Sequence, residues 1–142
     1  MSTIAAAADF VGLLTGRPYE PAGLHCWELV RTAQKLLFGR DLPPVLVAPE
    51  RRRELVGLMS LRHSYSGWGE IPEPQHGAVV FMTRNGHDLA QAACHAGVWL
   101  ALDGGGVLHT DDPHGVVFDS LPELAARNWG ELGFFIPTEP TA

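Results

Sequence analysis

Apolar residues in the first part of the chain recur at helical spacing. One apolar face is formed by Cys26, Leu29, Val30, Ala33 and Leu37. This spacing predicts a helix over residues 26–38, which Gly39 is well suited to end. The same kind of pattern predicts helices over residues 3–14 and 49–62.

The pattern changes in the second half, where short runs of β-branched and aromatic residues alternate with glycine and proline. Residues 63–75 contain Gly67, Gly69, Pro72 and Pro74 and are predicted to form a loop. The predicted strands cover residues 78–83, 93–102, 107–110, 115–119 and 133–136, with a short helix over 121–128. Helices followed by an antiparallel meander indicate a single α+β domain over residues 1–142, with a sheet of about five strands.

The bulk properties exclude several classes of partner. The chain of 142 residues suffices for one core, and its net charge of −6 offers no basic surface for nucleic acid or anionic lipid. No apolar run approaches the roughly 18 residues of a membrane span. Residues 1–16 lack the basic start of a signal peptide, so we expect synthesis in the cytoplasm. Two cysteines, Cys26 and Cys94, do not make a disulfide framework.

Cys26 stands where a glycine-containing loop turns into the predicted helix of residues 26–38. In the first turn of a helix, unpaired backbone N–H groups and the positive end of the dipole favour a thiolate. A small buried cysteine is also common at such a position, so both a nucleophile and a core residue fit. Cys94 precedes a predicted strand histidine and faces the other side of the sheet, which makes it a core residue.

A thiol nucleophile needs a base and a group that orients the base. His95 and His109 lie on two predicted strands joined by a glycine-rich turn, and pairing centred on residues 104–105 brings them close on one face. With Cys26 they would complete a Cys–His–His triad. The alternatives are structural histidines or a metal site. No CxxC, HxxxH or HExxH spacing is present, so the sequence favours neither a metal nor another cofactor.

Several segments, in order, resemble the motifs of NlpC/P60 cysteine peptidases. GLHCWELV at residues 23–30 resembles the segment around the nucleophile, and HAGVWL at 95–100 resembles the strand of the base. VLHT at 107–110 is similar to the strand of the third catalytic residue. The remaining matches are GRPY at 16–19, GRDLP at 39–43 and HGAVVF at 76–81. The ending, GVVF followed by WGELGFF, is most similar to the phage-tail branch of siphophage, Mu-like and gene-transfer particles.

The resemblance implies a papain-like fold in which the nucleophile begins a helix packed on an antiparallel sheet that carries the histidines. It implies cleavage of peptide bonds in peptidoglycan stem peptides, typically between D-glutamate and a diamino acid. Cys26 matches the nucleophile, His95 the base and His109 the orienting residue. Tyr19 matches an aromatic residue that lines the site, and His25 and Trp27, which flank Cys26, are assigned to substrate binding with it.

For tail members the resemblance implies a role in local wall opening or in assembly with other tail-tip proteins. Such a protein would be made in the bacterial cytoplasm and incorporated into a phage or phage-like tail. Two alternatives stay open: a structural tail component with little activity, and an amidase or acyltransferase on the same scaffold. Lipid-acting relatives usually carry histidine before cysteine, and here Cys26 precedes His95, which disfavours that branch.

Two positions depart from the family pattern. His25 stands before the nucleophile where Asp is common, and a histidine is expected to cap the helix poorly. Ala78 replaces the Asp that usually begins the first strand of the meander. Neither departure removes a member of the triad, but both bear on efficiency and substrate choice.

Overall fold

The computed structural model describes residues 4–20, 23–42, 68–84, 86, 95–111 and 113–137. Its helices are α1 (Ile4–Leu14), α2 (Cys26–Phe38) and α5 (Leu121–Ala126). The helices predicted over residues 3–14, 26–38 and 121–128 are therefore confirmed, with small shifts at their ends. The helix predicted over residues 49–62 and the core role expected for Cys94 lie outside the described residues.

An antiparallel sheet forms the second part of the fold. Its strands are β1 (Trp68–Ile71), β2 (Val79–Arg84), β3 (His95–Leu100), β4 (Gly106–Asp111), β5 (Gly115–Asp119) and β6 (Trp129–Pro137). They are arranged in the order β1-β6-β2-β3-β4-β5, so the described sheet has six strands rather than about five. The prediction of a loop throughout residues 63–75 was wrong over β1, which pairs with the far end of β6.

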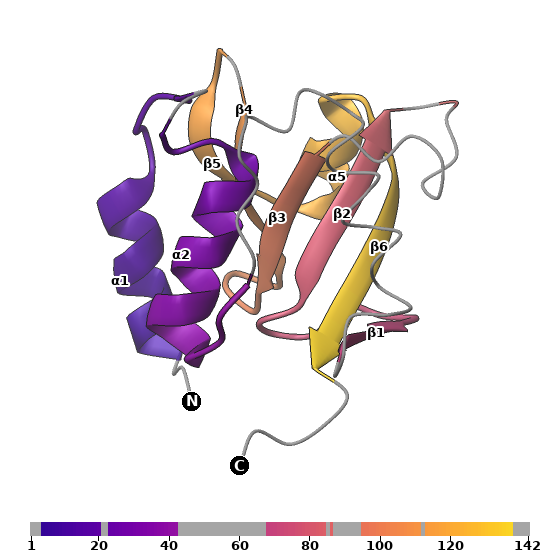
Figure 1. Ribbon diagram of the computed structural model, residues 1–142. Coiled ribbons are helices and arrows are strands. Elements are labelled where there is room, and N and C mark those ends of the chain that lie inside the picture. The colour runs from indigo at the N-terminus through magenta and orange to yellow at the C-terminus, as the bar shows by residue number, and fades with distance from the viewer. Residues whose placement is uncertain are drawn as a thin grey trace.

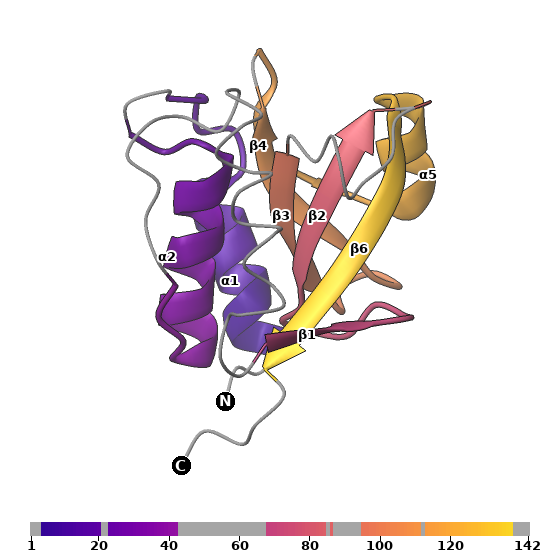
Figure 2. The same cartoon turned by 45° about the vertical axis from the view of Figure 1, so that its right-hand side comes forward.

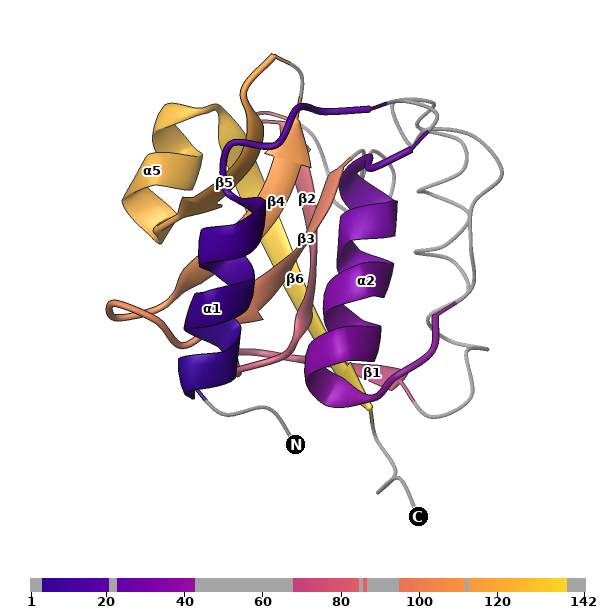
Figure 3. The same ribbon diagram turned by 90° about the vertical axis from the view of Figure 1, so that its left-hand side faces the viewer.

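Helices cover both faces of this sheet. Figures 1 and 2 show α1 and α2 side by side on one face, and α5 across the sheet from them. Seen from the side of the two long helices, α2 lies over β3 and β4 (Figure 3). This arrangement confirms the α+β class. Among the described helices, none has the length and apolar character needed to cross a membrane.

Two apolar clusters fill the space between the sheet and its helices. The helix-side core lies under α1 and α2 and contains Cys26, Leu29, Val30, Ala33, Ala96, Val98 and Leu108, among others. The α5-side core contains Val80, Met82, Trp99, Val107, Leu124 and Trp129, among others. Successive residues of a strand point to opposite faces. Because Trp99 faces α5, alternation along β3 places the His95 side chain on that side as well.

The second helix is defined by caps at both ends. His25 has an extended backbone and accepts a hydrogen bond from the Glu28 N–H through Nδ1, at 3.4 Å. At the other end Gly39 adopts a left-handed conformation, with φ of 66°, and its N–H bonds back to the last turn. Glycine tolerates this conformation without steric cost, which is why the helix ends there. The caps place Cys26 as the first helical residue.

Candidate active site

Cys26 occupies the position that the sequence predicted, at the start of α2. The thiol residue is almost fully buried, with 3% of its surface exposed, and it packs in the helix-side core with Ala96 of β3. Figures 1 and 3 show that α2 and β3 begin at the same end of the sheet. His95, the first residue of β3, therefore lies at the end of the molecule where α2 begins.

His25, which the sequence predicted to be a poor cap, caps the start of α2. Its ring accepts from the Glu28 N–H, as an Asp carboxylate would at this position. Only a nitrogen without a proton can accept, so capping requires that Nδ1 be unprotonated. The His25 side chain is buried, which fits a structural role beside Cys26. His25 therefore does cap α2, and its bond of 3.4 Å is long, as expected of a poor cap.

The predicted contact between the two strand histidines is present. Nε2 of His95 lies 2.8 Å from Nδ1 of His109, and both residues are buried. The hairpin is not centred on residues 104–105 as predicted, because Val98 pairs with Leu108 and the turn is centred on Asp103. In this register His95 and His109 are diagonal neighbours on one face of the sheet. Long side chains can meet across such a diagonal.

A carboxylate that the sequence analysis missed extends this pair. Asp119, at the end of β5, lies with Oδ2 2.8 Å from Nε2 of His109. Arg127, just after α5, donates from Nε to the same oxygen at 2.6 Å, and from a terminal nitrogen to Oδ1 at 3.5 Å. Four side chains therefore form one hydrogen-bonded series, which we call the histidine–aspartate chain: His95, His109, Asp119 and Arg127. The sequence signal that could have identified Asp119 is an acidic residue at the end of an apolar strand, directly before Ser120, which caps α5.

The ring of His95 also packs against an aromatic side chain, in addition to its hydrogen bond with His109. It stacks on Trp129 with ring centroids 4.5 Å apart and planes inclined by 9°. The Arg84 guanidinium covers the Trp129 ring at 3.8 Å from its centroid. Burial, followed by the charges of His109 and Arg84, lowers the pKa of His95 well below its ordinary value. His95 is therefore neutral near pH 7 and able to accept a proton.

Gly97 allows β3 and β4 to approach closely beside the two histidines. A Cβ atom at this position would lie 2.5 Å from Val107 Cγ1 and 2.7 Å from the backbone oxygen of Leu108. It would also lie 3.1 Å from the Cβ of His109. The backbone oxygen cannot move without displacing β4, so only glycine fits.

Gly97→Ala is expected to destabilise the fold by about 1–3 kcal/mol, the usual cost of overpacking. It should also lengthen the contact between the two histidines, because separating β3 from β4 moves His109 away from His95. Urea denaturation measures the loss of stability. Gly12→Ala in α1 is the matched control, because a Cβ there meets nothing within 4 Å. Equal stability of the Gly97→Ala and Gly12→Ala variants would contradict the prediction.

The structure separates the three residues assigned to substrate binding. Trp27 is 3% exposed and stacks on Phe81 in the helix-side core, so its ring packs inside the protein rather than at an accessible surface. His25 is buried and caps α2. Tyr19 is half-buried in the loop before α2. Of the three, Tyr19 alone presents appreciable surface.

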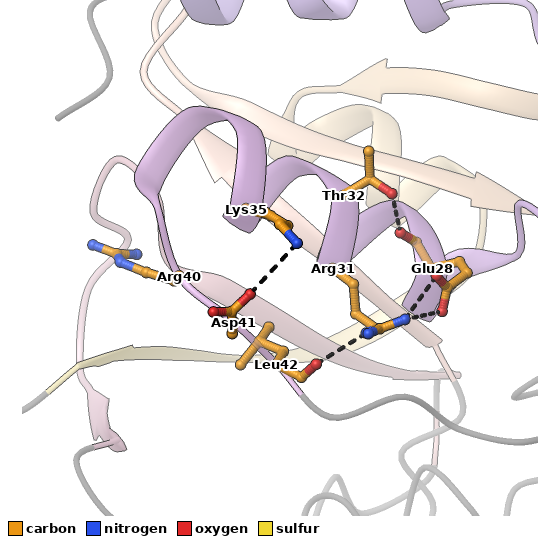
Figure 4. A pocket seen from close by; sticks show the side chains of 7 residues that line it. All are labelled: Glu28, Arg31, Thr32, Lys35, Arg40, Asp41 and Leu42. Atoms are coloured by element: carbon orange, nitrogen blue, oxygen red, sulfur yellow. Dashed lines mark hydrogen bonds and ion pairs between the residues drawn. The ribbon is translucent and has the colours of Figure 1, made fainter.

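Neither of two other arrangements among the described residues competes with this site. No group of three or more His, Cys, Asp or Glu side chains in the described ranges is placed to hold a metal ion. A charged hollow lies beside α2 (Figure 4), lined by Glu28, Arg31, Thr32, Lys35, Arg40, Asp41 and Leu42. Four of its five charges form pairs, Arg31 with Glu28 at 2.8 Å and Lys35 with Asp41 at 4.0 Å. The fifth, Arg40, donates to Gln34 Oε1 and to the Gly77 carbonyl oxygen.

Comparison with known proteins identifies no family for this chain. No protein-family model matches the sequence, and no curated protein does. Among solved structures, a comparison aligns the chain with the crystal structure of an N-acetylmuramoyl-L-alanine amidase from Bacteroides uniformis, at 12% identity and a TM-score of 0.37. That match covers 96% of this chain and 62% of the amidase chain. The assignment of function therefore rests on the residues of the site.

Proposed function

We propose that this protein is a cysteine hydrolase of the bacterial cell wall, with Cys26 as nucleophile, His95 as base and His109 as the residue that orients His95. The observation that carries the proposal is the buried pair of His95 and His109, hydrogen-bonded at 2.8 Å at the end of the sheet where Cys26 begins α2. The resemblance of the sequence to NlpC/P60 peptidases supports a papain-like arrangement. It also supports a peptidoglycan stem peptide as the substrate.

The proposed reaction is acyl transfer through a thioester. Nε2 of His95 is engaged with His109, so Nδ1 is the nitrogen that takes the proton of the Cys26 thiol. The sulfur then attacks the carbonyl carbon, and the Cys26 N–H at the start of α2 stabilises the oxyanion. His95 returns the proton to the leaving amine as the C–N bond breaks. Water, deprotonated by His95, hydrolyses the thioester and restores the thiol.

The positions of Cys26 and His95 limit the path that the proton could take in the proposed mechanism. The Cys26 side chain packs in the helix-side core, whereas alternation along β3 directs His95 toward the α5 side. We therefore propose that proton transfer takes place around the first residue of β3, at the open end of the strand, rather than through the sheet. The burial of both residues lowers the local dielectric and strengthens the interaction between their charged forms.

In the pH profile of kcat/KM, we expect the fall on the acidic side, called here the acidic limb, to lie well below pH 6.5. His95 acts as a base only when it is unprotonated, and its lowered pKa means that activity falls only when the pH drops through that low value. Folding stability should be full above about pH 6.5 and decrease below it, because the unfolded chain protonates His95 first. Arg84→Met should move the limb upward, because the Arg84 charge helps to lower this pKa. A limb at or above pH 6.5 in the unmodified protein would contradict the assignment of His95.

Incubation of the purified protein with peptidoglycan, followed by mass spectrometry of the released muropeptides, tests the proposal. The expected products end at D-glutamate on one side and begin with the diamino acid on the other. Release of intact stem peptides from muramic acid would instead identify an amidase. If the protein releases no muropeptides from walls of several peptide types, the assignment as a wall hydrolase is overturned.

We further propose that the protein acts in the tail of a phage or phage-like particle, in contact with other tail-tip proteins. The support is the resemblance of the sequence to the phage-tail branch of NlpC/P60 peptidases. Mass spectrometry of purified particles would detect the chain if it stays in the tail. Its presence only in lysates, and never in particles, would contradict this location.

A further inference from the structure

The third member of the histidine–aspartate chain, Asp119, lies between two groups that can donate hydrogen bonds to it, His109 and Arg127. Burial raises the pKa of Asp119, but the hydrogen bonds and charges of His109 and Arg127 outweigh burial and hold the net pKa below its ordinary value. Asp119 is therefore a carboxylate, which has no proton to donate. The proton between Asp119 and His109 must then reside on Nε2 of His109.

For a neutral His109, this fixes the direction of the next hydrogen bond. A neutral imidazole carries one proton, so His109 with that proton on Nε2 presents Nδ1 as an acceptor. His95 must then donate from Nε2, since that nitrogen faces His109 Nδ1 at 2.8 Å. The single proton of neutral His95 is thereby placed on Nε2, and Nδ1 is left as the basic nitrogen. In the opposite direction, His95 would carry its proton on Nδ1 and could not take one from a thiol.

We propose that Asp119, locked by Arg127, is a positioning residue that sets the tautomers of both histidines and so makes Nδ1 of His95 the base. Its effect on turnover rests on the proposed function, whereas the tautomers themselves do not. Asp119 touches neither the nucleophile nor the base; it acts on His95 through His109. The short helix α5, which a Ser120–Glu123 capping box starts, returns the chain so that Arg127 meets Asp119.

The role of Arg127 follows from the geometry at one oxygen. Both His109 Nε2 and Arg127 Nε lie within hydrogen-bond distance of Oδ2 of Asp119, at 2.8 and 2.6 Å. A guanidinium has only donors. If asparagine replaced Asp119, an NH₂ group at the position of Oδ2 would set two donors against each other. The amide oxygen is therefore favoured at this position, where it accepts from Arg127. Arg127 therefore specifies that an acceptor, and not a donor, faces His109.

This geometry predicts an unusual pattern among four variants. Asp119→Ala leaves the donor-only Arg127 as the neighbouring polar group, which favours the reversed tautomers and lowers kcat/KM by about 10³–10⁴-fold, as a wrong tautomer does in serine proteases. Asp119→Asn keeps an oxygen toward His109 because Arg127 orients the amide, and activity falls only about tenfold. Arg127→Met alone has a smaller effect, since either oxygen of Asp119 accepts. Combined with Asp119→Asn it removes the lock, and activity falls toward that of Asp119→Ala.

Nitrogen-15 NMR of labelled histidines in the full chain reads the tautomers directly. Protons on Nε2 of both His95 and His109 are expected in the unmodified protein and in Asp119→Asn, and reversal or mixing in Asp119→Ala and in the double variant. A proton on Nδ1 of His95 in the unmodified protein would overturn the proposal, even if every variant failed to fold. If Asp119→Asn and the double variant with Arg127→Met give equal spectra and equal activity, the role of Arg127 in orienting the amide is also overturned. Expected tautomers in a protein that cleaves no peptidoglycan would support the positioning role and refute the proposed function.

Discussion

Replacing Cys26 with alanine is expected to abolish cleavage of peptidoglycan, with a fall in rate of at least about 10⁴-fold. No other group in the proposed mechanism can form the thioester, and the remaining backbone donors and substrate contacts give only weak residual catalysis. Muropeptide release, followed by mass spectrometry, measures the loss. The variant should stay folded, because the change removes a single buried sulfur atom at the start of α2.

Cys94→Ala provides the matched control, since Cys94 is the other cysteine of the chain. It should retain activity and should still be inactivated by iodoacetamide, whereas Cys26→Ala has no activity left to inactivate. Cys26→Ser keeps the shape of the side chain but offers a much poorer nucleophile, and it should be nearly inactive as well. Wall clearing by Cys26→Ala at the rate of the unmodified protein would refute Cys26 as the nucleophile.

The second large effect is expected at His109. His109→Ala removes the acceptor for His95 Nε2 and leaves Asp119 and Arg127 without their imidazole partner, so kcat should fall by about 10²–10⁴-fold. His109→Asn should be markedly more active than His109→Ala, because its amide oxygen can still accept from His95. Papain-like Cys–His–Asn sites use an asparagine in the corresponding role.

Single-turnover kinetics locate this loss. If His109 orients the base, acylation slows in His109→Ala while substrate binding changes little, and asparagine restores part of the rate. Circular dichroism and urea denaturation check that both variants fold. A fall in stability with unchanged acylation, or no advantage of asparagine over alanine, would reduce His109 to a structural residue.

Local sequence signals were sufficient for much of the fold. The apolar face of α2 and the glycine after it act within a few turns of helix, and both predicted its limits. The glycine-rich turn after β3 predicted a hairpin, and a hairpin necessarily brings residues such as His95 and His109 near each other. The histidine pair could therefore be predicted even though the exact register was not.

Other features depended on segments far apart in the chain. β1 contains Gly69 and precedes Pro72, so its local signals indicate a loop, and pairing with β6 makes it a strand. Trp27 follows the proposed nucleophile and suggested a substrate contact, but packing against Phe81 buries it. In both cases tertiary contacts outweigh a weak local preference.

The sequence alone indicated the candidates for nucleophile and base, because helix starts and hairpins are specified by neighbouring residues. Only the tertiary structure decided what surrounds them. It brought Asp119 and Arg127 to His109 through the pairing of β5 with β4 and the return of α5. It also placed Cys26 and His95 at one end of the sheet, on opposite sides of β3. These relations depend on register and packing between distant elements, which no short pattern along the chain specifies.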